Sequence, residues 1–263
     1  MRADIETGAG VGNAERICSY FKRSIPSYEK NASVQQVVGQ NLVDQLTSFS
    51  DLRQNRVLEV GCCTGSTTAM LCDSFDIRKI WVNDLVEECC SMTAERIGAQ
   101  VEEAIALPGD IESVPLPQSL DLVISSSTYQ WLKDLAACFT RLEATLAEGG
   151  FFAFSMFGPG TMSQVQQLTG VGLNYPDENS IHAIVSRLFT IELIDTSHHR
   201  IYLDSPREVL RHIKNTGVGG VCGFRWTPSK LRAFETEYCS RFGAANGVPV
   251  DYAAITVIAR KLS

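Results

Sequence analysis

The chain has 263 residues, of which 44% are hydrophobic and 20% are charged, an ordinary composition for a globular domain. Its formal net charge of −7 argues against general nucleic-acid binding, and no apolar run reaches the roughly 18–20 residues that cross a bilayer. The nine cysteines include no C-x-x-C pair, so we expect free thiols in a reducing compartment, the cytoplasm, and no metal site.

Two helices are expected before the first strand. Residues 1–14 are polar and glycine-rich without an apolar signal core, and we interpret them as a disordered tail. A first helix is predicted over 15–28, where Pro26 should break it, and a second over 31–46, where apolar residues recur at helical spacing. We expect these helices to form a cover, 15–50, over a ligand site.

Short apolar strands then alternate with helices. The expected strands are 57–60, 79–83, 102–107, 120–125 and 151–156. The expected helices are 67–75, 86–97 and 132–146, the last ended by Glu148-Gly149-Gly150. Four strand–helix alternations in about a hundred residues predict a parallel, doubly wound sheet whose strand ends share one edge with the ligand. We assign residues 55–157 to this core.

The pattern changes after residue 160. Helices are expected at 161–168, 179–187, 205–215 and 228–242, and strands at 190–203 and 253–260. The chain is therefore predicted to be one α/β domain, 15–263, with a doubly wound, mostly parallel seven-stranded sheet. A helical lid would be inserted after the fifth strand. Within the domain, 158–250 would form the substrate lid and a late strand, and 251–263 the final strand.

A glycine turn follows the first strand of the core. Gly61 and Gly65 lie between that strand and the next helix, a geometry that lets the backbone approach a nucleotide-like ligand. Glu59 precedes the turn, where a carboxylate can reach a cationic or hydroxyl-bearing group. The alternative is a tight strand-to-helix turn without a ligand.

Two further acids follow the next two strands. Asp84 lies roughly 20 residues beyond the glycine turn, where a ribose diol would bind, although it could instead cap the next helix. Asp110 lies in Gly109-Asp110-Ile111, suited to an exocyclic amine, or to a simple loop turn. Three acids at three strand ends fit S-adenosylmethionine better than NAD, whose pyrophosphate favours a glycine-rich helix N-terminus.

These residues carry a family resemblance. Glu59-x-Gly61-x-Cys63-x-Gly65, with Asp84 and Gly109-Asp110-Ile111, resembles the class I S-adenosylmethionine-dependent methyltransferases. A narrower similarity, from about residue 15 to the end of the chain, is to the malonyl-acyl-carrier-protein O-methyltransferases of biotin synthesis. It rests on Tyr28-x-x-x-Ala32-x-x-Gln35, on 109–116, on Gln130-Trp131, on Lys214-x-Thr216-Gly217, and on Tyr252 with Ile258-Ala259-Arg260.

The resemblance implies a Rossmann-like fold and S-adenosylmethionine as cofactor. The residues that it implies for the cofactor site are Glu59, Gly61, Cys63, Gly65, Asp84, Leu85, Asp110, Ile111 and Ser125. Cys63 departs from the family, which usually has a second glycine there, and its side chain would crowd the methionine end of the cofactor.

The implied reaction methylates the free carboxylate of malonyl-acyl-carrier protein, or malonyl-coenzyme A, to its methyl ester in the early pimeloyl branch of biotin synthesis. A carboxylate is ionised at neutral pH, so no general base is needed. We predict Tyr28, Gln130 and Trp131 on the catalytic, substrate side, with core packing as the alternative. Arg200 and His212 are the candidate partners of the substrate carboxylate.

A basic segment offers a surface for a partner. Residues 198–232 contain seven Lys or Arg and two Asp or Glu, a net charge of 7 − 2 = +5 in a chain of −7. Arg207, Arg211 and Lys214 share one helical face at i, i+4 and i+7. This face is either a solvated surface or a dock for an acidic acyl-carrier protein.

Two other functions stay open. A methyltransferase for a free small carboxylic acid would need no carrier dock, and a non-catalytic cofactor-binding module would follow if Cys63 had cost the site its activity. We expect neither a nucleic-acid nor a membrane partner, and a monomer, although the sequence does not fix the oligomeric state or the acyl length accepted.

Overall fold

The structure is a computed structural model that describes residues 14–51, 53–217 and 226–262. The predicted tail, 1–14, lies outside the described residues except for Ala14, the first residue of α1. Within the described part of the chain, no helix is long and apolar enough to cross a membrane.

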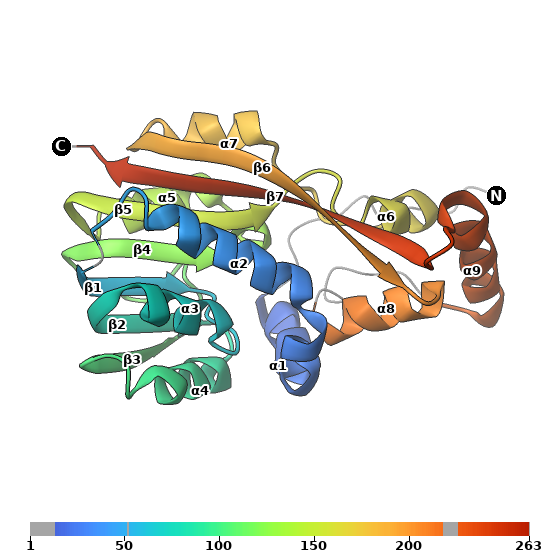
Figure 1. The fold of residues 1–263 in the computed structure, drawn as a ribbon, viewed down its shortest axis with the longest axis horizontal. Coiled ribbons are helices and arrows are strands. Elements are labelled where there is room, and N and C mark those ends of the chain that lie inside the picture. The colour runs from blue at the N-terminus through green and yellow to red at the C-terminus, as the bar shows by residue number, and fades with distance from the viewer. Residues whose placement is uncertain (1–13, 52, 218–225, 263) are drawn as a thin grey trace.

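One seven-stranded sheet organises the protein (Figure 1). The strands are β1 (Arg53–Val60), β2 (Asp76–Asp84), β3 (Glu103–Pro108), β4 (Leu120–Ser126), β5 (Leu146–Phe157), β6 (Phe189–Leu203) and β7 (Val248–Lys261). Their order is β3-β2-β1-β4-β5-β7-β6, with the first five parallel and β7 antiparallel to both neighbours. The predicted doubly wound, mostly parallel seven-stranded sheet is confirmed.

Helices and one short 3-10 turn surround this sheet. They are α1 (Ala14–Asn31), α2 (Ser33–Leu46), α3 (Ser66–Ser74), α4 (Glu87–Ile97), η1 (Tyr129–Trp131), α5 (Leu135–Glu143), α6 (Ser163–Thr169), α7 (Glu178–Val185), α8 (Pro206–Asn215) and α9 (Pro228–Phe242). In Figure 1, β6 and β7 extend beyond the other strands toward α8 and α9, and α1 lies between the sheet and α8.

Alternating side chains of the central strands supply a core on each face of the sheet. On β1, Leu58 and Val60 join one buried cluster while Val57 joins the other, as the two-residue period of a strand requires. A third cluster packs α2, α6, α8 and α9 against the extension of β7 around Val38, Tyr238 and other buried side chains. These four helices and the end of β7 therefore have a core of their own.

Pro26 does not end the first helix, and this prediction was wrong. α1 continues through it to Asn31, because a single proline removes one backbone donor and the surroundings compensate. The Ser27 hydroxyl contacts the carbonyl oxygens of Ser24 (3.1 Å) and of Asn215 (3.3 Å) in α8. Packing against α8 thus holds α1 together across the proline.

The helix after β4 is shorter than predicted and is not ended by the glycines. α5 stops at Glu143, and Glu148-Gly149-Gly150 belongs to β5. The pairing register of β4 and β5 shifts here, Gly149 has a φ of 71°, and a Cβ on Gly150 would lie 2.9 Å from the Leu120 carbonyl oxygen. These glycines serve a bulge in the sheet. No helix joins β3 to β4 in the described chain, so the core has three helical crossovers rather than four.

The predicted lid occurs in two places. α6 and α7 follow β5, but α8 and α9 lie between β6 and β7. The last strand starts at Val248, inside the range 158–250 predicted for the lid. The division of the chain into cover, core and lid stays a prediction.

Candidate active site

The turn after β1 takes left-handed backbone conformations that explain its glycines. Gly61 has a φ of 75° and Gly65 a φ of 80°, and a Cβ on Gly61 would lie 2.0 Å from Thr128 Oγ1. Cys63 shares this conformation, with a φ of 48°, where a side chain costs roughly 1–2 kcal/mol relative to glycine. The backbone therefore keeps a glycine geometry at the position where this chain has cysteine.

Asp84 connects this turn to the end of β2. Its Oδ2 accepts from the backbone N–H of Cys63 (3.0 Å) and its Oδ1 from that of Val86 (2.9 Å). Burial raises the pKa of the carboxyl above its ordinary value, whereas these hydrogen bonds lower it. Asp84 thus braces the glycine turn and the start of α4 while its remaining lone pairs are available to a ligand.

A cavity of about 790 Å³, partly open to solvent, lies over the carboxyl ends of β1–β4 beneath α1, and we call it the large cavity. Six of the nine predicted cofactor residues line it: Gly61, Cys63, Asp84, Leu85, Asp110 and Ile111. Asp110 accepts at Oδ1 from the N–H of Glu112 (2.9 Å), so it stabilises the loop turn and also lines the cavity.

Glu59, Gly65 and Ser125 do not line this cavity, and their contact with a cofactor stays a prediction. Glu59 is 1% exposed and accepts from the Thr68 hydroxyl, and burial raises the pKa of its carboxyl to about 7. Gly65 caps α3, and the Ser125 hydroxyl donates to the Val60 carbonyl (2.8 Å). All three support the turn.

The three residues after Ser125 lie where Ser125 was predicted, on the wall of the cavity. Ser126, Ser127 and Thr128 line the large cavity. Because side chains of a strand alternate between faces, the buried Ser125 and the cavity-lining Ser126 point in opposite directions. The sequence shows a cluster of serines at the end of this strand, but it does not show which of them faces the cavity.

A second cavity of about 360 Å³ adjoins the first, and we call it the small cavity. All three predicted catalytic residues, Tyr28, Gln130 and Trp131, line it, and Tyr28 and Trp131 also line the large cavity. Phe21 and Ser127 are shared in the same way, and the rings of Phe21 and Trp131 meet edge-on with centroids 5.4 Å apart. These four residues form the shared wall of the two cavities.

Gln130 has a positioning role in this loop. Its Nε2 donates to the Ser127 carbonyl (2.5 Å), and its Oε1 accepts from the N–H of Phe157 (3.4 Å). Both ends of the amide are thus bonded to the protein, which fixes the loop after β4 against the end of β5.

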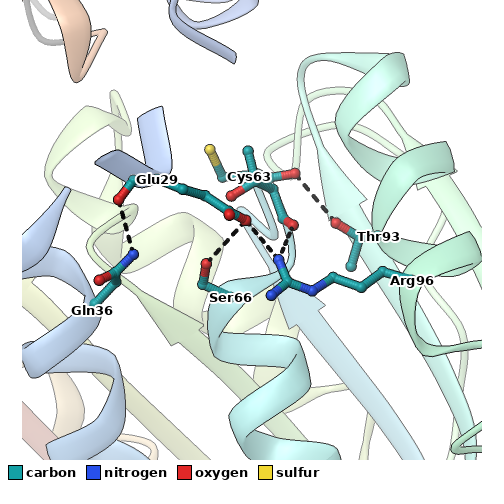
Figure 2. Close-up of polar contacts among 7 residues, drawn as sticks. Glu29, Gln36, Cys63, Ser66, Thr93 and Arg96 are labelled. Atoms are coloured by element: carbon teal, nitrogen blue, oxygen red, sulfur yellow. Dashed lines mark hydrogen bonds and ion pairs between the residues drawn. The ribbon is translucent and has the colours of Figure 1, made fainter. Parts of the chain in front are cut away.

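Polar contacts hold α1 over the glycine turn (Figure 2). Glu29 accepts at Oε1 from Arg96 Nη1 (2.6 Å), and the same nitrogen donates to the Thr64 carbonyl (3.0 Å). The Gln36 amide donates to the Glu29 carbonyl (3.1 Å) and links α2 to this contact. The cover is therefore tied to the turn that it covers.

Arg200 and His212 line neither cavity, and the geometry gives no support to their predicted contact with the substrate carboxylate. Arg200 forms a two-point ion pair with Asp251, at 2.5 and 2.9 Å. His212 is buried and its Nε2 lies 2.6 Å from the Tyr252 hydroxyl, and burial lowers the pKa of its imidazole, so the ring is neutral at pH 7. Neither side chain lines either cavity.

The predicted basic face is exposed on α8, but two of its charges are paired. Arg207 forms an ion pair with Glu235, and Arg211 with Glu208 (2.7 Å). Lys214 is exposed, and no ion pair to it occurs among the described residues.

Comparison with known proteins gives consistent results. A family model described as a methyltransferase domain matches residues 58–154. A malonyl-acyl-carrier-protein O-methyltransferase from Chlorobium phaeovibrioides is 35% identical over 258 residues, covering 96% of this chain and 98% of the relative. The protein of the same name from Prosthecochloris aestuarii is 33% identical, covering 95% and 94%.

Solved structures resemble the fold at low sequence identity. YcgJ from Bacillus subtilis has a TM-score of 0.61 at 16% identity, covering 85% of this chain and 99% of that one. The N-methyltransferase NodS from Bradyrhizobium japonicum, in complex with S-adenosyl-L-homocysteine, has a TM-score of 0.54 at 13% identity, covering 94% and 100%. These similarities establish the class of fold.

Proposed function

This chain belongs to the malonyl-acyl-carrier-protein O-methyltransferase family, and on that premise we propose that it methylates the free carboxylate of a malonyl thioester on an acyl-carrier protein, using S-adenosylmethionine. The observation that carries the proposal is a large, acid-lined cavity joined to a small cavity across one shared wall. Such a pair can hold a nucleoside cofactor and an acyl group side by side. The product would be the methyl ester used at the start of biotin synthesis.

The residues of the large cavity fit this cofactor. Carboxylates at the ends of β2 and β3, Asp84 and Asp110, can accept from ribose hydroxyls and an exocyclic amine, and Leu85 and Ile111 offer apolar contact to a base. The left-handed turn at Gly61 and Cys63 brings backbone close to the methionine end. When bound, S-adenosylmethionine supplies a sulfonium methyl group that a carboxylate oxygen can take.

The protein's part in the reaction is binding and exclusion of water. The substrate carboxylate is already ionised at neutral pH, so the proposal assigns no general base. Tyr28, Ser127 and Trp131 of the shared wall would align the carboxylate with the methyl group, and the cover formed by α1 would keep water out. An aligned, poorly solvated carboxylate is a stronger nucleophile than one in water.

An acidic carrier would dock at the exposed face of α8. Arg207, Arg211 and Lys214 give this face a basic stripe, although Glu235 and Glu208 reduce its field. The remaining attraction would steer a carrier toward the mouth of the site and act mainly on the rate of association. The eight described cysteines are free thiols, which supports a cytoplasmic location.

The test is a methyl-transfer assay with labelled S-adenosylmethionine. Malonyl-carrier protein, malonyl-coenzyme A and free malonate would be offered separately at equal concentrations. The proposal predicts label mainly on the carrier-bound substrate. Label confined to free acids would instead make the protein a small-molecule methyltransferase, and cofactor binding without transfer to any malonyl substrate would make it a non-catalytic module.

A further inference from the structure

The described residues give the small cavity a neutral wall. None of the described residues that line it is charged, and Phe21, Trp131, Phe157, Met162 and Leu173 give it an apolar character. A cation that could pair with a substrate carboxylate is therefore missing from this part of the wall. Any polar group that enters must be held by neutral hydrogen-bond donors.

Several polar groups in this wall already have partners within the protein. Both ends of the Gln130 amide are bonded, as described above. The Thr161 hydroxyl donates to the Ala253 carbonyl (3.1 Å), and the Tyr252 hydroxyl bonds to His212. These groups complete the wall and have little capacity left for a ligand.

Two polar side chains of this wall have a buried oxygen atom without a partner among the described residues. Gln35 of α2 is 8% exposed, yet its side-chain oxygen has no hydrogen-bond partner among the described residues. The Ser127 hydroxyl is likewise buried without a partner. A buried polar atom without a partner is unfavourable, so two of them on one cavity wall are available to a ligand that enters it.

The position of each group indicates which part of the ligand it meets. Ser127 belongs to the shared wall, whereas Gln35 lines only the small cavity. The reacting carboxylate has to lie at the shared wall, because the methyl donor binds on its other side. A malonyl thioester has a second polar group one methylene away, its thioester carbonyl, and that group then points into the small cavity.

Resting on the proposed function, we propose that the small cavity is the malonyl site, in which Ser127 hydrogen-bonds the reacting carboxylate and Gln35 hydrogen-bonds the thioester carbonyl. The Gln35 amide can turn over to present its N–H2 as donor, and the Ser127 hydroxyl donates directly. Neutral donors also suit the chemistry. A cation here would repel a sulfonium and would bind the carboxylate too tightly for it to attack.

Binding of malonyl-carrier protein to the enzyme loaded with S-adenosylhomocysteine tests this inference without turnover. Gln35→Met should weaken that binding on the order of 10- to 100-fold, because it removes one buried hydrogen bond to the ligand. Gln40→Met is the matched control, since Gln40 lies on the same helix, bonds to Asp44 and lines neither cavity. Its binding should equal that of the wild type.

A carrier analogue in which a methylene replaces the thioester carbonyl identifies the group that Gln35 meets. The affinity of the wild type for this analogue should be lower than its affinity for malonyl-carrier by the same factor as Gln35→Met causes. The affinity of the variant should be the same for both ligands. Additive losses would overturn the assignment. The melting temperature of free Gln35→Met should equal or exceed that of the wild type, because an unpaired buried amide has been removed.

Ser127→Ala gives a second, independent test. It should weaken binding of malonyl-carrier more than binding of acetyl-carrier, which has no carboxylate, whereas Ser113→Ala on an exposed loop should change neither. Two results would overturn this inference and leave the proposed function intact, provided that the wild type methylates malonyl-carrier. One is an equal effect of Ser127→Ala on both carriers, and the other is normal malonyl-carrier binding by both Gln35→Met and Ser127→Ala. A wild type that does not bind S-adenosylhomocysteine would overturn the proposed function and this inference together.

Discussion

The walls of the two cavities are built in opposite ways. The large cavity takes its polar residues from successive strand ends, where Cys63, Asp84 and Asp110 follow β1, β2 and β3. The small cavity gathers residues from α1, α2, the loop after β4, the segment after α6 and β7, between Phe21 and Tyr252. One is a product of sheet topology, and the other depends on how distant helices pack.

This difference between the walls corresponds to two tasks, binding a nucleoside and binding one particular acyl group. Parallel strands bring their carboxyl ends to one edge whatever the loops contain, so a nucleoside site needs only short local motifs. An acyl site must fit one substrate, and its neutral wall depends on helices that could pack otherwise. Charged groups therefore characterise the large cavity, whereas the shape set by helix packing characterises the small one.

The largest expected effect concerns the buried carboxyl under the glycine turn. The pKa of Glu59 is raised to about 7 in the folded protein from 4.5, so between these values the folded state holds a proton that the unfolded state has lost. Stability should therefore fall as pH rises from about 4.5 to above 7, by about 3 kcal/mol in total.

Glu59→Gln removes this dependence. Its stability relative to the wild type should rise by about 3 kcal/mol between pH 4.5 and pH 8, as measured by urea unfolding at several pH values. Glu95→Gln, an exposed glutamate on α4, is the control. A Glu59→Gln difference that is flat with pH would show that the folded protein does not raise the pKa of Glu59.

Asp84→Asn should separate the two cavities by ligand. Loss of the carboxylate should weaken S-adenosylhomocysteine binding roughly 10- to 100-fold, because hydrogen bonds to a charged group are the stronger kind. Calorimetric titration would measure it, with the exposed Asp73→Asn on α3 as control. Unchanged cofactor affinity would remove Asp84 from the site and weaken the contrast between the two walls.

Charge reversal on α8 tests whether the helical side also receives the carrier. Arg207→Glu with Arg211→Glu should lower kcat/KM several-fold for malonyl-carrier and much less for malonyl-coenzyme A, and added salt should reduce the difference. Arg78→Glu, which breaks an exposed ion pair with Glu102 at the other end of the sheet, is the control. Equal effects on both substrates would exclude a dock on this face.

The smallest effect should come from the contact between cover and turn. Glu29→Gln should cost less than about 1 kcal/mol of stability, because Glu29 and Arg96 are 48% and 42% exposed. It should nevertheless speed release of S-adenosylhomocysteine in a stopped-flow experiment, since α1 covers that cavity. Glu88→Gln, which breaks a second α1–α4 ion pair to Lys22, is the control, and equal release rates in both variants would refute a specific latch.

The sequence predicted the large cavity better than the small one for a physical reason. Gly61, Asp84 and Asp110 were readable because a strand end followed by a turn is a local pattern. Ser125 was chosen in place of Ser126 because only the register of the strand decides between them. The partners of Arg200 and His212 lie 51 and 40 residues away, on β7, and no local pattern reveals such pairs.

The fold, too, was predicted well where the signal is local and poorly where tertiary contacts decide. Elements with clear periodicity appeared where they were expected, whereas Pro26 and Gly149 were misread because tertiary contacts override local preference. Pro26 sits in a helix supported by α8, and Gly149 in a strand whose register shifts against β4. Gln35 was noticed only as part of a family motif, and its missing hydrogen bond is visible only in three dimensions.

The docking of α1 on α8 has a consequence for biosynthesis. Ser27 and Asn31 of α1 bond to Asn215, 188 and 184 residues further along the chain, and β7, which lies between β5 and β6, follows every other described strand in sequence. Contacts of such sequence separation form late. On the ribosome, α1 therefore waits until α8 has been made before it can dock, and the nascent protein cannot close its active site earlier than that.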